Sequence, residues 1–122
     1  MLADAAIAPV FDPVAIEKLR KVAGDQGDTF IAEIAQLFLE EAGKSVEEMR
    51  LACEQANWLK VGHLAHSMKS SAATLGLMRL SEACRDLERA GQGPLSTPAT
   101  PALATEVIHQ FERAIPTLKK LS

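Results

Sequence analysis

Apolar residues recur every three or four positions through most of this chain, a spacing that places them on one side of an α-helix. The clearest case lies between Asp28 and Ala56. The residues that recur there are Ile31, Ile34, Phe38, Met49 and Cys53, while the acids Glu40, Glu41, Glu47 and Glu48 fall elsewhere. The same spacing appears in residues 57–75, 78–90 and 100–121. No stretch alternates strictly between apolar and polar residues, so the pattern predicts an all-α fold.

Helix start and stop signals divide these segments. Asp12 followed by Pro13 is a typical helix start, and Gly24 ends a short first helix. Asn57 is the expected N-cap of a helix that reaches Leu75 and stops at Gly76, and Thr100 before Pro101 is the expected N-cap of the last helix. Four substantial amphipathic helices with short connections predict an antiparallel four-helix bundle with an additional short N-terminal helix.

Length and composition limit the possible classes of protein. The 122 residues suffice for one domain, which we place at residues 12–122 after a flexible linker at 1–11. A net charge of −3 argues against nucleic acid as a partner, and no apolar run is long enough to cross a membrane. Cys53 and Cys84 lack metal-binding spacing, so we expect reduced, buried thiols in a cytoplasmic protein.

The stretch "AHSMKSSAATLG" (Ala65–Gly76) contains the best candidate for chemistry, His66. At roughly 100° per residue, His66 lies about 160° from the centre of the apolar cluster of its helix. That cluster consists of Val61, Leu64, Met68, Ala72 and Leu75. We therefore expect His66 to face away from the core. Its neighbours on that outer face are small, polar or weakly apolar: Leu59, Gly62, His63, Lys69, Ser70 and Ala73.

The distribution of charge favours an anionic ligand at this position. Residues 55–81 contain no Asp or Glu, but they contain Lys60, Lys69 and Arg79. This predicts a locally positive surface around His66, suited to a phosphoryl group or an acidic partner. On the following helix, the charged residues are expected to pair along their own helix; these are Arg79, Arg85, Glu88 and Arg89.

An exposed neutral imidazole is a nucleophile with a free lone pair. It can attack phosphorus in line, and Lys69, one turn further on, can offset the charge on the equatorial oxygens. The chain has neither a P-loop nor a kinase glycine-rich loop. The phosphoryl group is therefore expected to come from another protein.

The sequence "AHSMKSSAATLGLMRLSEACRDLE" resembles the histidine-containing phosphotransfer (HPt) domain, whose pattern is roughly A-H-x-L-K-G-[SA]-[SA]-x-x-[LIV]-G followed by L-x-x-x-C-x-x-L-E. The resemblance extends over about Phe11 to Ala90. It implies that His66 is the phosphorylated histidine and that Lys69 is the basic residue beside it. It also implies that Gly76 closes the helix and that Leu80, Cys84 and Leu87 are core positions.

The resemblance further implies the partners and the setting. Such domains accept a phosphoryl group from an aspartate of a response-regulator receiver domain and pass it to another receiver or return it. The domain itself has no ATP site and no cofactor, and the Mg²⁺ that assists transfer is bound by the receiver. The expected form is a monomeric domain, without direct membrane contact of its own. The Ala/Pro-rich start of the chain favours, over a free-standing protein, the C-terminal domain of a bacterial hybrid sensor histidine kinase that is tethered to the inner membrane.

One position departs from the family pattern, because Ser70 stands where the family usually has glycine. We expect this serine to alter the choice of partner or the transfer rate. Partner docking is expected to involve Leu59, Gly62, His63, Ala73 and Arg79.

Two other classes remain open at this stage. One is a helical adaptor, a pseudo-HPt domain that binds a signalling partner through the same face without being phosphorylated. The other is a metal-binding bundle that uses His63 and His66, although His109 is expected to face outward from its own helix.

Overall fold

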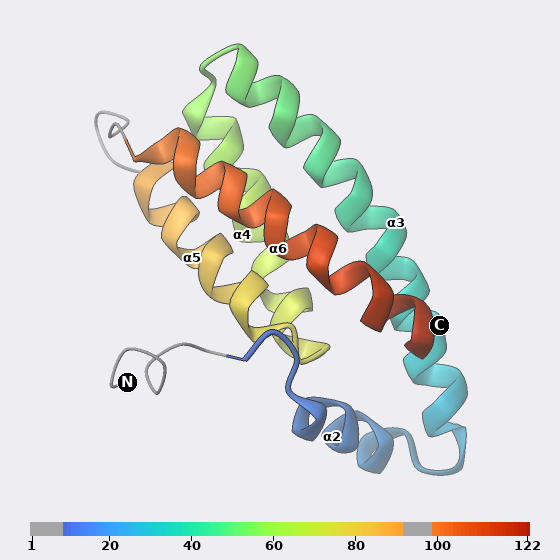
Figure 1. Ribbon diagram of the computed structural model, residues 1–122. Helices are drawn as coiled ribbons and strands as arrows, with labels where there is room; N and C mark the ends of the chain where they lie inside the picture. Colours follow the sequence, from blue (N-terminus) through green and yellow to red (C-terminus); the bar gives the residue numbers. More distant parts are fainter. Residues whose placement is uncertain (1–8, 92–98) are drawn as a thin grey trace, which may run out of the picture.

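The computed structural model describes residues 9–91 and 99–122, and every regular element within these residues is helical. The elements are α2 (Pro13–Ala23), a 3₁₀ turn η1 (Gly24–Gln26), α3 (Gly27–Glu54), α4 (Trp58–Thr74), α5 (Met78–Gly91) and α6 (Thr100–Leu121). The four long helices run alternately up and down (Figure 1). The predicted all-α class, the antiparallel bundle and the short N-terminal helix are confirmed.

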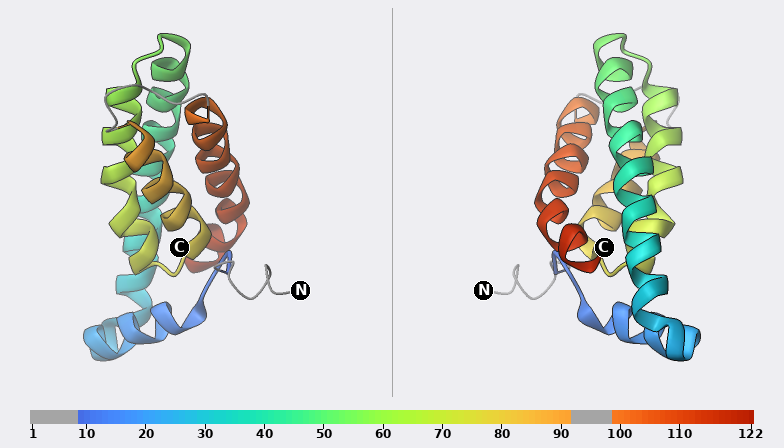
Figure 2. Two further views of the ribbon diagram at one scale, coloured as in Figure 1. Left: turned by 90° about the vertical axis from the view of Figure 1, so that its left-hand side faces the viewer. Right: turned by 90° about the vertical axis from the view of Figure 1, so that its right-hand side faces the viewer.

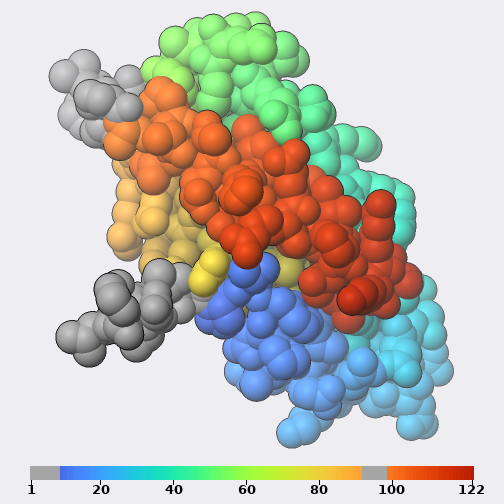
Figure 3. Space-filling model, viewed as in Figure 1, coloured from blue at the N-terminus to red at the C-terminus, as the bar shows by residue number. Residues whose placement is uncertain are grey.

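The four helices of the bundle are arranged in chain order. α4 packs most extensively against α5, α5 packs against α6, and α3 packs against both α4 and α6. α2 lies across one end of the bundle and packs against the first part of α3 (Figure 2). Figure 3 shows α6, in orange to red, covering one face of the bundle, with α2 in blue at its lower end. α2 and α6 contact α4 less extensively than α3 and α5 do.

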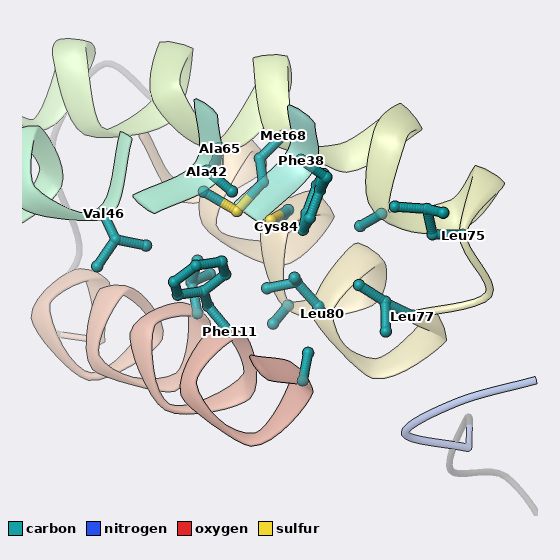
Figure 4. Close-up of a cluster of buried hydrophobic side chains, with 14 of the residues drawn as sticks. Phe38, Ala42, Val46, Ala65, Met68, Leu75, Leu77, Leu80, Cys84 and Phe111 are labelled. Carbon is teal, nitrogen blue, oxygen red and sulfur yellow. The ribbon is translucent and has the colours of Figure 1, made fainter. Parts of the chain in front are cut away.

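The core is aliphatic, with two phenylalanines from neighbouring helices. Side chains from α3, α4, α5 and α6 point into a shared interior (Figure 4). The rings of Phe38 and Phe111 contact each other with centroids 6.4 Å apart. The largest fully buried side chains include Met49, Leu75, Leu77, Leu80, Leu87 and Leu118. Burial of each contributes about 1.5–3 kcal/mol to folding, so these side chains hold the four helices together.

Two helix starts and two helix stops agree with the signals in the sequence, and Gly24, with φ of 61°, ends α2 as expected. The Asp12 side chain accepts a hydrogen bond from the Val14 N–H at 3.0 Å, and the Asn57 side chain accepts one from the Lys60 N–H at 3.3 Å. Gly76 has φ of 79°, and a Cβ there would lie 2.4 Å from the Asp12 carbonyl oxygen. The Asp12 N–H donates to the Gly76 carbonyl at 2.7 Å. Only glycine fits this position, which joins the end of α4 to the start of α2.

The start of α6 differs from the prediction. Thr100 is not the N-cap but the first residue of the helix, and it is fully buried; Ala99 precedes it without a side-chain cap. Burial of the threonine side chain against the bundle therefore replaces its expected capping role.

The two cysteines are free thiols in different surroundings. Cys84 is buried as expected, and burial raises the pKa of its thiol to about 12. Cys53 is only partly buried, which the prediction of two buried thiols missed.

Residues 1–8 of the expected linker lie outside the described residues, but residues 9–11 contact the bundle. The Pro9 carbonyl accepts a hydrogen bond from the Arg79 N–H at 3.1 Å, and Phe11 packs against the core. Across residues 9–91 and 99–122, none of the helices has both the length and the apolar character needed to span a bilayer.

A pair of glycines sets the distance between α4 and α5. Gly62 on α4 and Gly91 at the end of α5 are both buried. A Cβ built at Gly91 would lie 2.9 Å from the Gly62 Cα and 2.9 Å from the Trp58 carbonyl oxygen. Contacts this short with backbone atoms exclude any side chain, so the two helices approach each other backbone to backbone at this end.

This contact predicts the effect of adding one methyl group. Gly91→Ala should destabilise the domain by about 1–3 kcal/mol, because backbone atoms must move to admit the Cβ. Gly43→Ala is the matched control, since a Cβ at this helical glycine meets nothing within 4 Å. The control should stabilise by about 0.5–1 kcal/mol through helix propensity. Urea unfolding measures both changes, and equal effects of the two substitutions would contradict the assigned role of Gly91.

Candidate functional site

His66 lies on the outer face of α4, and 66% of its side chain is exposed. The core-facing residues of the same helix include Val61, Ala65 and Met68, which are almost completely buried. The imidazole therefore points away from the core, as the helical projection predicts, and a partner protein can reach it.

A carboxylate from the neighbouring helix holds this imidazole. The Glu88 Oε1 atom on α5 lies 2.6 Å from the His66 Nδ1 atom, and the other carboxylate oxygen, Oε2, accepts a hydrogen bond from the Lys69 Nζ atom at 2.6 Å. The Glu88 side chain is only 12% exposed, and that of Lys69 is 29% exposed. A single buried carboxylate thus joins the two α4 residues that the sequence singles out.

The hydrogen bond to Glu88 determines which ring nitrogen is free. An ionised carboxylate only accepts hydrogen bonds, so the proton of the neutral imidazole is on Nδ1. The Nε2 atom then carries the lone pair. Because Nδ1 faces α5, Nε2 is the nitrogen available to an incoming electrophile.

Glu88 stays ionised in this arrangement. The hydrogen bond from Lys69, followed by that from His66, holds the pKa of the Glu88 carboxyl below its usual value, and partial burial opposes this only in part. The charges of Lys69 and Glu88 offset each other at 2.6 Å. The prediction of a simple positive surface around His66 is therefore wrong, because the acid comes from a different helix.

Glu88 is the site residue that the sequence reasoning missed. It was expected to pair with arginines of its own helix, whereas Arg85 pairs with Glu82 at 3.8 Å and Glu88 turns toward α4. One signal was available: Glu88 follows Cys84 by four residues and Leu80 by eight, so it lies on the buried stripe of α5. A carboxylate on such a stripe needs a partner.

The remaining predicted residues fall into three groups. Ser70, His63 and Leu59 are exposed on the outer face of α4, with 60% exposure for Leu59. Ala73 on α4 and Arg79 at the start of α5 are partly buried. The assignment of Gly62 to the docking face is wrong, because this glycine is buried against Gly91.

A groove between α3 and α4 lies next to the exposed imidazole. Its volume is about 510 Å³, and the residues lining it from α4 include Ser67, Ser70, Ser71 and Thr74. From α3 it is lined mainly by apolar side chains, among them Phe30, Ile34 and Leu37, of which Leu37 is 55% exposed. Glu41 and Ser45 of the same helix also line it. Ser67 directly follows His66, and Ser70 lies one helical turn beyond it. The groove and the imidazole therefore share one surface of α4.

No group of three or more His, Cys, Asp or Glu side chains within residues 9–91 and 99–122 is placed to hold a metal ion. His109 is exposed on α6, as expected from its helix.

The fold and this site together define a class: a four-helix bundle that presents one carboxylate-held histidine on its surface and belongs to the histidine phosphotransfer proteins. The model of the Hpt domain family matches residues 33–119, and the chain belongs to this family. Such domains are phosphotransfer modules of two-component signalling without a catalytic ATP site of their own.

One solved structure illustrates the shared fold. The histidine-containing phosphotransfer protein B (HptB) of Pseudomonas aeruginosa PAO1 is similar with a TM-score of 0.77 and 22% sequence identity. The similarity covers 93% of this chain and 94% of that one. None of the curated proteins compared with the chain matches it.

The bonds to Glu88 predict how stability depends on acidity. The folded pKa of Glu88 lies below the usual value of 4.5, so its bonds stabilise the domain above about pH 4.5 and are lost as the pH falls through the folded value. Wild type should therefore exceed Glu88→Gln in unfolding free energy at pH 7, and this difference should shrink toward pH 3. Urea unfolding at several pH values measures it. Glu82→Gln on the same helix is the control, and a Glu88→Gln difference that did not change with pH would contradict the ion-pair geometry.

Proposed function

We propose that this domain is a phosphorelay intermediate that accepts a phosphoryl group on His66 from the aspartyl phosphate of a receiver domain. It then passes the group to the aspartate of another receiver, or returns it. The observation that carries the proposal is the exposed imidazole whose Nδ1 atom is held by Glu88 at 2.6 Å, which leaves Nε2 free. Membership of the Hpt family supports the same proposal.

Transfer follows directly from this geometry. The Nε2 lone pair attacks the phosphorus atom in line, and the phosphorus–oxygen bond to the receiver aspartate breaks with its electron pair on the carboxylate. The proton on Nδ1 stays in place, and Glu88 balances the positive charge that develops on the ring. The reverse step returns the electron pair of the phosphorus–nitrogen bond to Nε2.

Lys69 has a second role beside its bond to Glu88. Its ammonium group has three N–H donors, of which one points to Glu88 Oε2. Another can donate to an equatorial phosphoryl oxygen of a group on His66. The Mg²⁺ that assists transfer belongs, in this proposal, to the receiver, since the Glu88 carboxylate already accepts from two side chains.

The groove between α3 and α4 is the proposed docking surface for the receiver. It combines apolar side chains and one acid, Glu41, of α3 with the small hydroxyl residues of α4, and it adjoins His66. A receiver surface with apolar side chains would cover Leu37 and Phe30 and bring its aspartate toward the imidazole. Ser70 lies on this rim, so in this proposal a serine in place of glycine affects docking or rate.

Removing the imidazole tests the nucleophile. The full chain incubated with an aspartyl-phosphorylated receiver domain should give an acid-labile, alkali-stable adduct on His66. His66→Gln should abolish the adduct and leave the unfolding free energy close to that of wild type, because the side chain is largely exposed. Mass spectrometry and urea unfolding provide the two readouts.

His63→Gln is the matched control, since His63 is exposed one turn before His66 on the same helix. It should keep the adduct. A non-phosphorylated helical adaptor predicts instead that partner function survives in His66→Gln, and that outcome would overturn the relay.

A charge placed in the groove tests the docking surface. Leu37→Glu should raise the domain concentration needed for half-maximal transfer by about tenfold or more, because a carboxylate would have to be desolvated against an apolar partner. Leu51→Glu is the control, since Leu51 lies on the same helix with 57% exposure against 55% for Leu37 but does not line the groove. Transfer assays with a phosphorylated receiver compare the two variants. An equal loss of transfer in both variants would contradict docking at this groove.

A further inference from the structure

The same carboxylate contacts both the ring and the lysine of the proposed phosphorylation site, and this has a consequence for the phosphorylated state. We propose that Glu88 is a positioning residue that retains the Nδ1 proton of phosphorylated His66 and thereby keeps the phosphoryl group transferable. The inference rests on the proposed function, since it concerns a phosphoryl group on Nε2. In this proposal Glu88 controls how long the phosphohistidine persists.

The Nδ1 proton decides whether the phosphorus–nitrogen bond can break, because it determines the charge of the leaving group. When the phosphorus–nitrogen bond breaks, its electron pair goes to Nε2 and the phosphoryl group goes to an aspartate or to water. With a proton on Nδ1 the leaving group is neutral imidazole, whereas without that proton it is an imidazolate anion, which is a much poorer leaving group. The phosphohistidine therefore becomes inert as the pH rises and the Nδ1 proton is lost.

Glu88 opposes the loss of this proton. Its Oε1 atom accepts from Nδ1 at 2.6 Å, and a hydrogen bond to a charged acceptor is stronger than one to a neutral acceptor. The Glu88 side chain is 12% exposed, so water competes little for the carboxylate. The imidazole is thus anchored on its Nδ1 side and open on its Nε2 side.

The other charged and titratable groups near the site come from α3, α4 and α5. On α5 the thiol of Cys84 interacts with Lys69 and Glu88, but burial raises its pKa to about 12, so it stays neutral between about pH 6 and pH 10. On α3 Glu41 lines the groove together with Ser67 and Ser70.

Lys69 of α4 binds the second carboxylate oxygen and so weakens the pull of Glu88 on the Nδ1 proton. His63 lies one turn earlier on α4 and is exposed, and on α5 the nearest arginine one turn before, Arg85, pairs with Glu82. Glu88 therefore favours retention of the Nδ1 proton, and Lys69 opposes it.

The test uses the full chain and potassium phosphoramidate, a small phosphorus–nitrogen donor that requires no receiver. After removal of the donor, ³¹P NMR follows the decay of the His66 phosphohistidine to orthophosphate between about pH 6 and pH 10. Its resonance is the one that is missing in His66→Gln, which separates it from phosphorylated His63 and His109, both exposed. In wild type the decay rate should fall with rising pH, and in Glu88→Gln this fall should occur about one pH unit lower. On the falling part of the curve the variant phosphohistidine should then live about tenfold longer.

Two variants separate this role from a structural one. Lys69→Met removes the competing ion pair but keeps the carboxylate beside His66. In this variant the decay rate should therefore begin to fall at the same pH as in wild type or at a higher pH. Glu82→Gln removes an acid from the same helix outside the site and should give the wild-type profile. If Glu88→Gln gave the wild-type profile, or if Lys69→Met shifted it downward as Glu88→Gln does, the inference would be overturned.

The experiment also separates this inference from the proposed function. Phosphorylation by phosphoramidate with a shifted profile in Glu88→Gln supports the role of Glu88. Failure of the same phosphorylated wild-type chain to exchange its phosphoryl group with any receiver would contradict the relay alone.

Discussion

The close packing of α4 against α5 is the constraint on which the site depends. Two glycines let the backbones meet at one end, where a single added Cβ would lie 2.9 Å from backbone atoms of the facing helix. Further along, the Ser81 hydroxyl of α5 donates to the Lys69 carbonyl of α4 at 3.1 Å. Between these two contacts, Glu88 reaches across to His66 and Lys69. A modest change in helix separation would break both 2.6 Å bonds.

This packing gives α4 three faces with different tasks. The inner face holds the bundle through aliphatic side chains such as Met68 and Leu75. The flank toward α5 carries the charged residues that orient the imidazole, and the flank toward α3 opens into the apolar groove. His66 lies between the two flanks on the exposed side. The chemistry and the proposed docking surface can therefore change independently, because different neighbouring helices supply their residues.

Sequence reasoning predicted what depends on one helix at a time. The helix boundaries followed from local signals such as Asp12 and Gly76, and the outward direction of His66 followed from the 3.6-residue period. Those properties are set by residues within a few turns of each other. The Hpt family match then confirmed the class that the motif around His66 indicated.

What the sequence did not reveal depends on two helices together. Glu88 is 22 residues from His66, and its orientation follows from the packing of α5 rather than from its own neighbours. Gly62 lies beside His66 on a helical projection, but its environment is decided by Gly91 of the next helix. The groove likewise needs both α3 and α4. A carboxylate or a glycine on the buried side of a helix indicates that such a contact exists, but the sequence alone does not identify the partner residue.

The central claim is that Glu88 fixes the His66 proton on Nδ1 and leaves Nε2 as the nucleophile. Long-range ¹H–¹⁵N correlation NMR of the histidine rings at about pH 8 tests it directly, because protonated and lone-pair nitrogens of a neutral imidazole differ widely in ¹⁵N shift. We predict a protonated Nδ1 and a lone pair on Nε2 for His66 in wild type, with a mixture of the two tautomers in Glu88→Ala. A His66 ring protonated on Nε2 in the wild-type domain would contradict the account.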